Sequence, residues 1–185
     1  MEQLRTSLKI ALALVLLGIV LLAIWPGRMT RTTGIEIDVR RYRMKGELLI
    51  NALNNDLPAS QVFTEAELNA YCRELVANQP TAGKGSHLED IGVRFIGGRA
   101  EAFVSVQRGP FTLTAQIMAK PKGSRLVVTG ARAGHLPLPG FLGRLYATTQ
   151  ARLLRQLKNE SRILRHLDGV SIEEGTIELL VKPGS

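Results

Sequence analysis

The sequence predicts an α+β protein in which an N-terminal transmembrane helix is followed by an antiparallel β-sheet and a long C-terminal amphipathic helix. Three observations predict this arrangement. Residues 10–25 form an uncharged apolar run, residues 88–132 alternate apolar and polar side chains between turn signals, and residues 141–167 repeat apolar side chains at helical spacing. We therefore expect a signal anchor over residues 1–27 and one α+β domain over residues 28–185.

The composition restricts the core and the partners. Aromatic residues make up only 5% of the 185 residues, so the core is expected to consist of Leu, Ile, Val and Ala. The formal net charge of +8 points to an acidic partner, either a nucleic acid or an anionic membrane surface. The single cysteine, Cys72, excludes an internal disulfide.

The N-terminal run is just long enough to cross a bilayer. A transmembrane helix needs about 20 mainly apolar residues, and the stretch Leu8–Trp25 meets this if Lys9 extends its ammonium group to the headgroups. Trp25 suits the membrane interface. The alternative is a cleaved signal peptide, but the run ends in "LLAIWPG" without a clear cleavage site, so we predict an uncleaved anchor. The flanking cations leave its orientation undecided.

Two segments follow the anchor before the sheet. The stretch 35–39 alternates Ile and Val with acidic residues and is interpreted as a short strand. Residues 40–53 are ambiguous, although Met44, Leu48, Leu49 and Ala52 fit a helix, and residues 54–60 have the composition of a loop.

A helix is expected to begin after Thr64. The hydroxyl of Thr64 and the carboxylate of Glu67, three residues later, form the pattern of a capping box. The apolar face of this helix is predicted to consist of Leu68, Tyr71, Cys72 and Leu75.

Hairpin signals divide the alternating region into a meander of three to four strands. Gly97-Gly98 suits a two-residue turn, and the following strands end at "RGP" and "PKGS". In the stretch after "RGP", Phe111, Leu113, Ala115 and Ile117 share one side. A further hairpin is expected near the C-terminus, with Glu174-Gly175 at its turn.

The predicted helix over residues 141–167 has two different faces. Leucines and Ile163 occupy one broad face, with Glu160 among them, and no acidic residue interrupts the opposite face. That opposite face is either simply solvated or contacts anionic lipid headgroups, and the cluster of cations over residues 40–45, close to the anchor, supports headgroup contact. The headgroup candidates are Arg144, Arg152, Arg155, Lys158, Arg162 and Arg165.

No set of residues with catalytic spacing is present. His87, His135 and His166 are scattered, and Cys72 lies on an apolar helix face, where a small buried side chain is the better interpretation. We therefore expect no enzyme activity, no metal and no cofactor. A nucleic-acid partner is not expected either, because the phenylalanines do not form the exposed stacking pattern of an RNA-binding sheet.

The corner "AGHLPLPGFLGRLY" joins the sheet to the long helix. Pro137 and Pro139 lack backbone donors and end the strand pattern, while Leu136, Leu138, Phe141 and Leu142 keep the corner apolar. The corner is either a plug at the end of the core or the rim of a lipid groove.

The order of these parts resembles that of known proteins. An anchor, the helix start "FTEAELNAY", a meander, "GHLPLPGFLGRL", a long helix and a final "GTIELLV" strand resemble small bacterial membrane-anchored envelope proteins of the YpmS-like and YceB-like type. These are related in shape to the tubular lipid-binding (TULIP-like) superfamily. The resemblance extends from Val62 to Val181.

The resemblance implies a curved antiparallel β-sheet packed around the long helix, with an apolar groove between them for acyl chains. It also implies that the domain lies outside the cytoplasm, facing the periplasm or cell exterior from a single-pass anchor in the bacterial inner membrane. On this basis the ligand-groove candidates are Leu136, Leu138, Phe141, Leu142, Leu145, Leu153, Phe111 and Leu113.

The expected function is therefore non-enzymatic binding or passage of lipid-like molecules, with a phospholipid or fatty acid as ligand. An apolar groove of this kind needs no polar signature. The alternative is a structural or assembly subunit of an envelope complex, in which an exposed strand edge and the basic helix face hold a protein partner.

Overall fold

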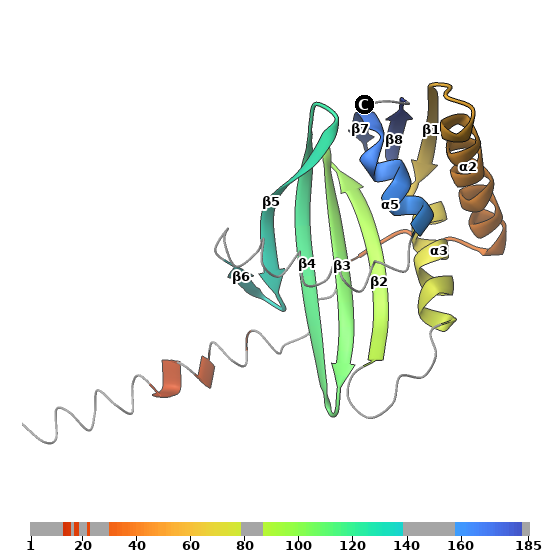
Figure 1. Cartoon of the computed structure of the whole chain (residues 1–185). Coiled ribbons are helices and arrows are strands. Elements are labelled where there is room, and N and C mark those ends of the chain that lie inside the picture. Colours follow the sequence, from red (N-terminus) through yellow and green to blue (C-terminus); the bar gives the residue numbers. More distant parts are fainter. Residues whose placement is uncertain are drawn as a thin grey trace, which may run out of the picture.

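The computed structural model describes residues 13–15, 17–18, 22, 30–78, 87–138 and 158–182. It confirms an α+β protein (Figure 1). The elements are α2 (Glu36–Asn54), β1 (Ala59–Thr64), α3 (Glu65–Ala77), β2 (His87–Ile96), β3 (Arg99–Arg108), β4 (Phe111–Lys122), β5 (Arg125–Ala133), β6 (Leu136–Leu138), α5 (Lys158–Arg165), β7 (Leu167–Glu173) and β8 (Thr176–Val181).

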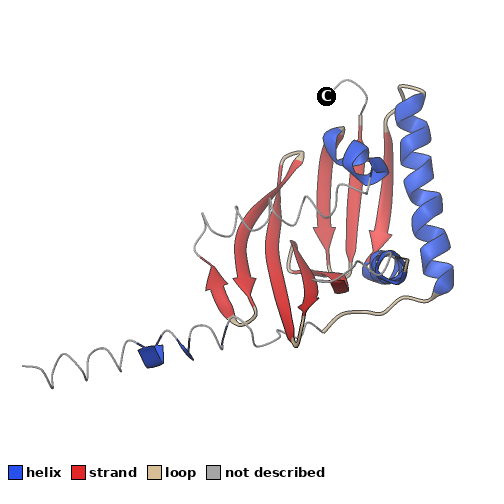
Figure 2. Cartoon of the chain, turned by 60° about the horizontal axis from the view of Figure 1, so that its bottom comes forward, coloured by secondary structure: helices blue, strands red, loops and turns tan. Residues whose placement is uncertain are grey.

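The strands form two antiparallel sheets. The larger has the order β2-β3-β4-β5-β6 and the smaller the order β1-β8-β7, and Figure 2 shows them as separate layers. The predicted meander and the predicted C-terminal hairpin are both confirmed. Strand β1 was not predicted, because its first residues lie in the stretch whose composition favours a loop; it pairs with β8, more than 100 residues away along the chain.

Glycines make the hairpin turns that the sequence predicts, as two of these turns illustrate. Gly97 and Gly98 have φ angles of 54° and 70°, and Gly175 has a φ of 73°. Side chains with a Cβ rarely adopt these angles, which is why the glycines mark the turns so clearly.

The strand predicted for residues 35–39 is wrong, since α2 already covers this stretch. The Asp38 carboxylate accepts a hydrogen bond from the Ile35 N–H at 2.8 Å, and Glu36 pairs with Arg40 one turn later. Acidic side chains stabilise the first turn of a helix. Ile35 and Ile37 are 67% and 49% exposed, so these alternating apolar side chains do not pack into a core as they would in a strand. Residues 40–53, for which the sequence was ambiguous, also belong to α2.

The main core lies where the smaller sheet meets α2, α5 and one end of the larger sheet. Leu49 of α2 and Val181 of β8 are completely buried, whereas Met44 and Leu48 of α2 are exposed. The buried members are Leu49, Leu53, Phe63, Phe95, Ile163, Leu167, Ile172, Ile177 and Val181.

Two predictions fall largely on residues that the structure does not describe. The anchor Leu8–Trp25 lies mostly outside the described residues, and within the described ranges no helix has both the length and the apolar character needed to cross a bilayer. Of the helix predicted for residues 141–167, α5 is the described part; it ends at Arg165, and Leu167 is already the first residue of β7.

Candidate functional site

One face of the five-stranded sheet is apolar on every strand. Residues that pair directly across neighbouring strands point to the same face, and side chains alternate along each strand. We call this surface the apolar face; the strand register assigns to it Leu88, Ile91, Val93, Phe95, Ala100, Ala102, Val104, Val106, Phe111, Leu113, Ala115, Ile117, Ala119, Pro121, Leu126, Val128, Ala131, Ala133, Leu136 and Leu138. One cation, the exposed Arg108, lies opposite Phe111 on the same face.

Small side chains occupy the middle of the apolar face. Ala115 and Ala131, in the central part of β4 and in β5, are 2% and 4% exposed. At the opposite end from the main core, Phe111 and Leu113 remain 53% and 38% exposed. The face is therefore covered at its centre and still presents large apolar side chains at one end.

Four of the eight predicted groove residues share this face. Leu136 pairs with Ala133 and Leu138 with Ala131, while Leu113 pairs with Val106, and Phe111 lies two residues before Leu113 on the same strand. The other four candidates, Phe141, Leu142, Leu145 and Leu153, lie outside the described residues.

The outer edge of the larger sheet, on β2, is closed by polar groups of other elements. The Asn69 amide, 2% exposed, accepts a hydrogen bond from the Val93 N–H at 2.8 Å and donates one to the Val93 carbonyl at 2.9 Å. The Glu65 carboxylate accepts from the Phe95 N–H at 3.2 Å, and Arg31 donates to the Ile91 carbonyl at 2.9 Å. A partner strand therefore cannot pair with this stretch of β2.

The buried face predicted for α3 is only partly correct. Leu68, Tyr71, Cys72 and Leu75 are half-buried, whereas the most deeply buried side chains at the start of the helix are polar. These are Glu65, Glu67 and Asn69, and no pattern in the sequence marks them as buried.

The predicted capping box of α3 is confirmed and has a second role. The Glu67 N–H donates to the Thr64 hydroxyl at 3.2 Å, and the Thr64 N–H donates to the Glu67 carboxylate at 2.9 Å. Lys45 of α2 also donates to both carboxylate oxygens of Glu67, at 2.7 and 2.8 Å. The "FTEAELNAY" motif thus joins α2, β1, α3 and β2, which gives its polar residues a structural role.

The cations that follow the anchor are neutralised locally. In α2, Arg40 pairs with Glu36 at 2.6 Å, Arg41 lies 3.7 Å from Asp38, and Arg43 pairs with Glu74 of α3. Lys45 pairs with Glu67 as described above. Because every one of these cations has a carboxylate partner, this cluster offers less to anionic headgroups than its sequence indicates.

The structure describes the side chains of two of the six headgroup candidates. Arg162 and Arg165 belong to α5, and both are exposed. Lys158 is the first residue of α5, while Arg144, Arg152 and Arg155 lie outside the described residues.

A groove of about 470 Å³ lies between the N-terminal part of α2 and α3. Two of its arginines are those paired with Glu36 and Glu74, and a third, Arg73, donates to the Gly34 carbonyl at 3.1 Å. No groove residue predicted from the sequence lines it. These three arginines already pair with carboxylates or with a backbone carbonyl of the protein, so they indicate no particular ligand.

Glu160 connects α5 to the two other helices. Its carboxylate accepts hydrogen bonds from Tyr71 at 2.8 Å and from Tyr42 at 3.4 Å, and the two tyrosine rings stack with centroids 4.2 Å apart. Burial is the main cause that raises the pKa of both tyrosines above the usual value, and the charge of Glu160 and its hydrogen bonds to the phenols raise it further. The phenols therefore stay protonated and act as fixed donors.

Cys72 lacks the environment of a reactive thiol. Burial raises the pKa of the Cys72 thiol to about 11, whereas nucleophilic cysteines have a lowered pKa. Within the described ranges, no three His, Cys, Asp or Glu side chains gather where a metal ion could be held.

Comparisons with known proteins found no match: no family model, no curated protein and no solved structure is significantly similar to this chain.

Proposed function

We propose that this protein is a membrane-anchored, non-enzymatic domain that binds the acyl chains of lipid-like molecules on its apolar face. The observation that carries the proposal is the apolar face itself, which extends over all five strands and keeps Phe111 and Leu113 exposed at one end. In a soluble domain, a large apolar surface that is not fully covered is characteristic of a binding site.

We propose that the helix that the sequence predicts before α5 forms the second wall of this site. The chain leaves the apolar face at Leu138, on the edge strand β6, and re-enters at Lys158 in α5, which packs on α2 beyond the opposite edge. Four interstrand spacings of about 4.8 Å amount to about 19 Å. The intervening residues 139–157 would extend about 28 Å as a helix, which is enough to cross the sheet. In this proposal the leucines of residues 141–157 face the sheet, with the acyl chain between them.

Burial of the acyl chain by itself can supply the affinity of this site. Burying one methylene group contributes about 0.8 kcal/mol, so ten buried methylenes contribute about 8 kcal/mol. A binding free energy of that size corresponds to a dissociation constant of about 1 μM. Neither a charged side chain nor a metal is needed for such affinity.

The proposed location is the bacterial inner membrane, with residues 1–27 as a single-pass anchor and the domain on the outer side. The apolar run Leu8–Trp25 supports the anchor, and the resemblance to small envelope proteins supports the orientation. The charged residues that flank the anchor do not by themselves determine its orientation.

The test is native mass spectrometry of the protein released from its membrane, followed by lipid extraction and uptake of a fluorescent fatty acid. Leu113→Asp introduces a charge into the apolar face at a position that is 38% exposed, so we expect loss of bound lipid with the fold retained. Leu138→Asp tests the β6 side of the same surface.

The matched control is Leu57→Asp, the same chemical change at a 57% exposed leucine in the turn between α2 and β1. This variant is expected to bind lipid like the wild-type protein. A wild-type protein that carries no lipid and takes up no fatty acid would refute the proposal and leave the assembly role as the better explanation.

A further inference from the structure

The other face of the five-stranded sheet is rich in cations. The register places Arg94 opposite Glu101, Arg132 opposite Gln116, and Arg125 opposite Lys122, all on the side away from the apolar face. We call this surface the basic face; its cations are Arg94, Arg99, Lys120, Lys122, Arg125 and Arg132. The last four are exposed to solvent.

Most of these cations lack an acidic partner. Arg99 pairs with Glu101 at 3.0 Å. In the part of the chain that the structure describes, the other five have no carboxylate within 4.0 Å, in contrast to the fully paired cations of α2. The basic face therefore carries more unpaired positive charge than α2 does.

The N-terminal segment reaches the domain on this same face. The Arg31 guanidinium lies 4.9 Å from the centre of the Phe103 ring and donates to the Asp90 carboxylate at 2.9 Å. Arg31 is six residues beyond Trp25, and six extended residues span at most about 20 Å. The part of the basic face around Phe103 and Arg132 is thus held near the end of the proposed anchor.

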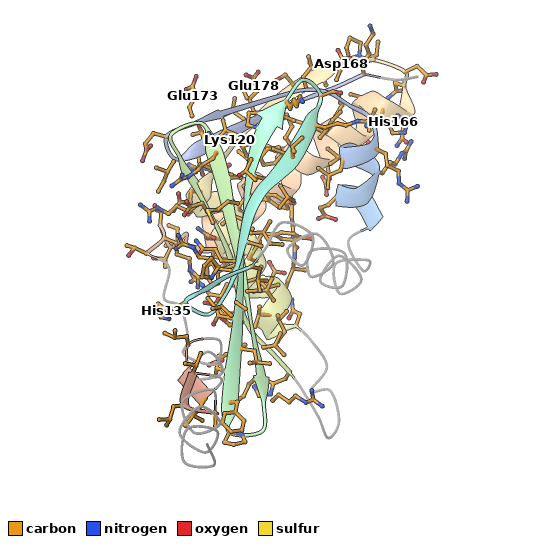
Figure 3. The ribbon with its side chains drawn as sticks, turned by 90° about the vertical axis from the view of Figure 1, so that its left-hand side faces the viewer. Lys120, His135, His166, Asp168, Glu173 and Glu178 are labelled. Carbon is orange, nitrogen blue, oxygen red and sulfur yellow. The ribbon has the colours of Figure 1, made fainter. Side chains whose placement is uncertain are left out.

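Acidic side chains of the smaller sheet lie close to one end of the basic face, since β7 contacts both β4 and β5. In Figure 3, Asp168, Glu173 and Glu178 of the β7–β8 hairpin lie along the upper rim, and Lys120 lies just below Glu173 and Glu178. The turn at His135 lies lower on that flank, and its N–H donates to the Leu22 carbonyl at 3.1 Å. The N-terminal residues thus contact the domain at a distance from the acidic rim.

We propose that the basic face docks on the anionic headgroups of the membrane that carries the anchor, with the apolar face turned away from that membrane. The proposal rests on the anchor of the proposed function. Each Lys or Arg held near an anionic bilayer strengthens its attachment about fivefold. A nucleic acid fits this face poorly, because its one phenylalanine, Phe103, is 6% exposed and covered by Arg31.

The experiment uses the full chain reconstituted into vesicles of phosphatidylcholine alone, or with one third phosphatidylglycerol. A membrane-impermeant amine reagent acetylates exposed lysines, and mass spectrometry measures the rate at each site. We expect acetylation of Lys120 and Lys122 to slow at least fivefold in the anionic vesicles, relative to Lys182. Salt at about 0.5 M, where the Debye length is about 4 Å, should restore the rate.

Two double variants provide the matched comparison. Lys122→Glu with Arg132→Glu should abolish the protection of Lys120, whereas Arg162→Glu with Arg165→Glu, the same change of charge on exposed residues of α5, should preserve it. Circular dichroism confirms that each variant is folded.

Equal acetylation in both vesicle types would overturn the proposal. Protection that also occurs in phosphatidylcholine and increases with protein density would overturn it as well, since it would show that a second copy of the chain covers this face. Flotation with phosphatidylcholine vesicles tests the anchor separately. If the chain does not float with phosphatidylcholine vesicles but phosphatidylglycerol protects its lysines in a salt-sensitive way, the proposal for the basic face is supported and the proposed anchor is refuted.

Discussion

Replacing Asn69 with alanine should remove the amide that closes the β2 edge. The side chain is 2% exposed and bonds three backbone groups: the Val93 N–H, the Val93 carbonyl and, at 2.9 Å, the Thr32 carbonyl. A buried polar group left without a partner costs about 1–3 kcal/mol. Allowing for some relaxation, we expect Asn69→Ala to lower the free energy of unfolding by about 3–5 kcal/mol, a large share of the stability of an ordinary domain.

Equilibrium urea unfolding of the full chain in detergent, followed by far-ultraviolet circular dichroism, measures this loss. Fluorescence is a poor reporter, because the only tryptophan, Trp25, lies in the proposed anchor. Asn69→Asp keeps the shape but removes both N–H donors, so its loss should be at least as large. Asn78→Ala is the control at an exposed asparagine that ends α3, where we expect less than about 0.5 kcal/mol.

A loss below about 1 kcal/mol for Asn69→Ala would refute this reasoning, because it would mean that water or another side chain already satisfies Val93. Closure of the edge also has a consequence for solubility. Once the amide is gone, the backbone of β2 can pair with another copy, so the variant should aggregate more readily at high protein concentration than the Asn78→Ala control.

Further predictions concern the buried titratable groups. At pH 8 the Cys72 thiol should react with a disulfide reagent about 100-fold more slowly in the folded than in the unfolded protein, because its pKa is raised from 9.0 to about 11. Since the unfolded thiol ionises first, stability should fall as pH rises from 9 to 11, and Cys72→Ala should weaken that fall in urea titrations at each pH. Tyr71→Phe should cost about 1–2 kcal/mol, and a double-mutant cycle with Glu160→Gln should show coupling between them. Lys45→Met should cost about 3 kcal/mol by leaving Glu67 buried without its cation, and adding Glu67→Gln should recover part of that loss.

Local signals carried the correct predictions of the fold. The hairpin at Gly97-Gly98 and the capping box at Thr64 are each defined by residues within a few positions of one another. A short stretch of sequence therefore contains every residue needed to predict them. The stretch 35–39 was predicted incorrectly because three alternating apolar residues fit a strand as well as the exposed start of a helix. Strand β1 was missed because its partner, β8, lies far along the chain.

The same distinction applies to the candidate site. Phe111, Leu113, Leu136 and Leu138 could be grouped from alternation alone, since the pleat assigns every second residue to one face. The closure of the β2 edge could not be predicted, because the partners of Asn69 come from β2 and from the segment before α2. The role of a buried asparagine can be recognised only when the positions of the backbone groups that it bonds are known.

The two faces of the large sheet depend on one irregularity in β5. The register shifts there so that Met118 pairs with Gly130 but the next residue, Ala119, pairs with Val128, leaving Thr129 as the extra residue of a bulge. Beyond it, Leu126 lies on the apolar face and packs against the main core, while Arg125 lies on the basic face. A regular ladder would exchange these two positions, exposing a leucine to solvent and placing an arginine against the core. The bulge at Thr129 is therefore what keeps the proposed lipid surface and the proposed membrane surface on opposite sides of a single sheet.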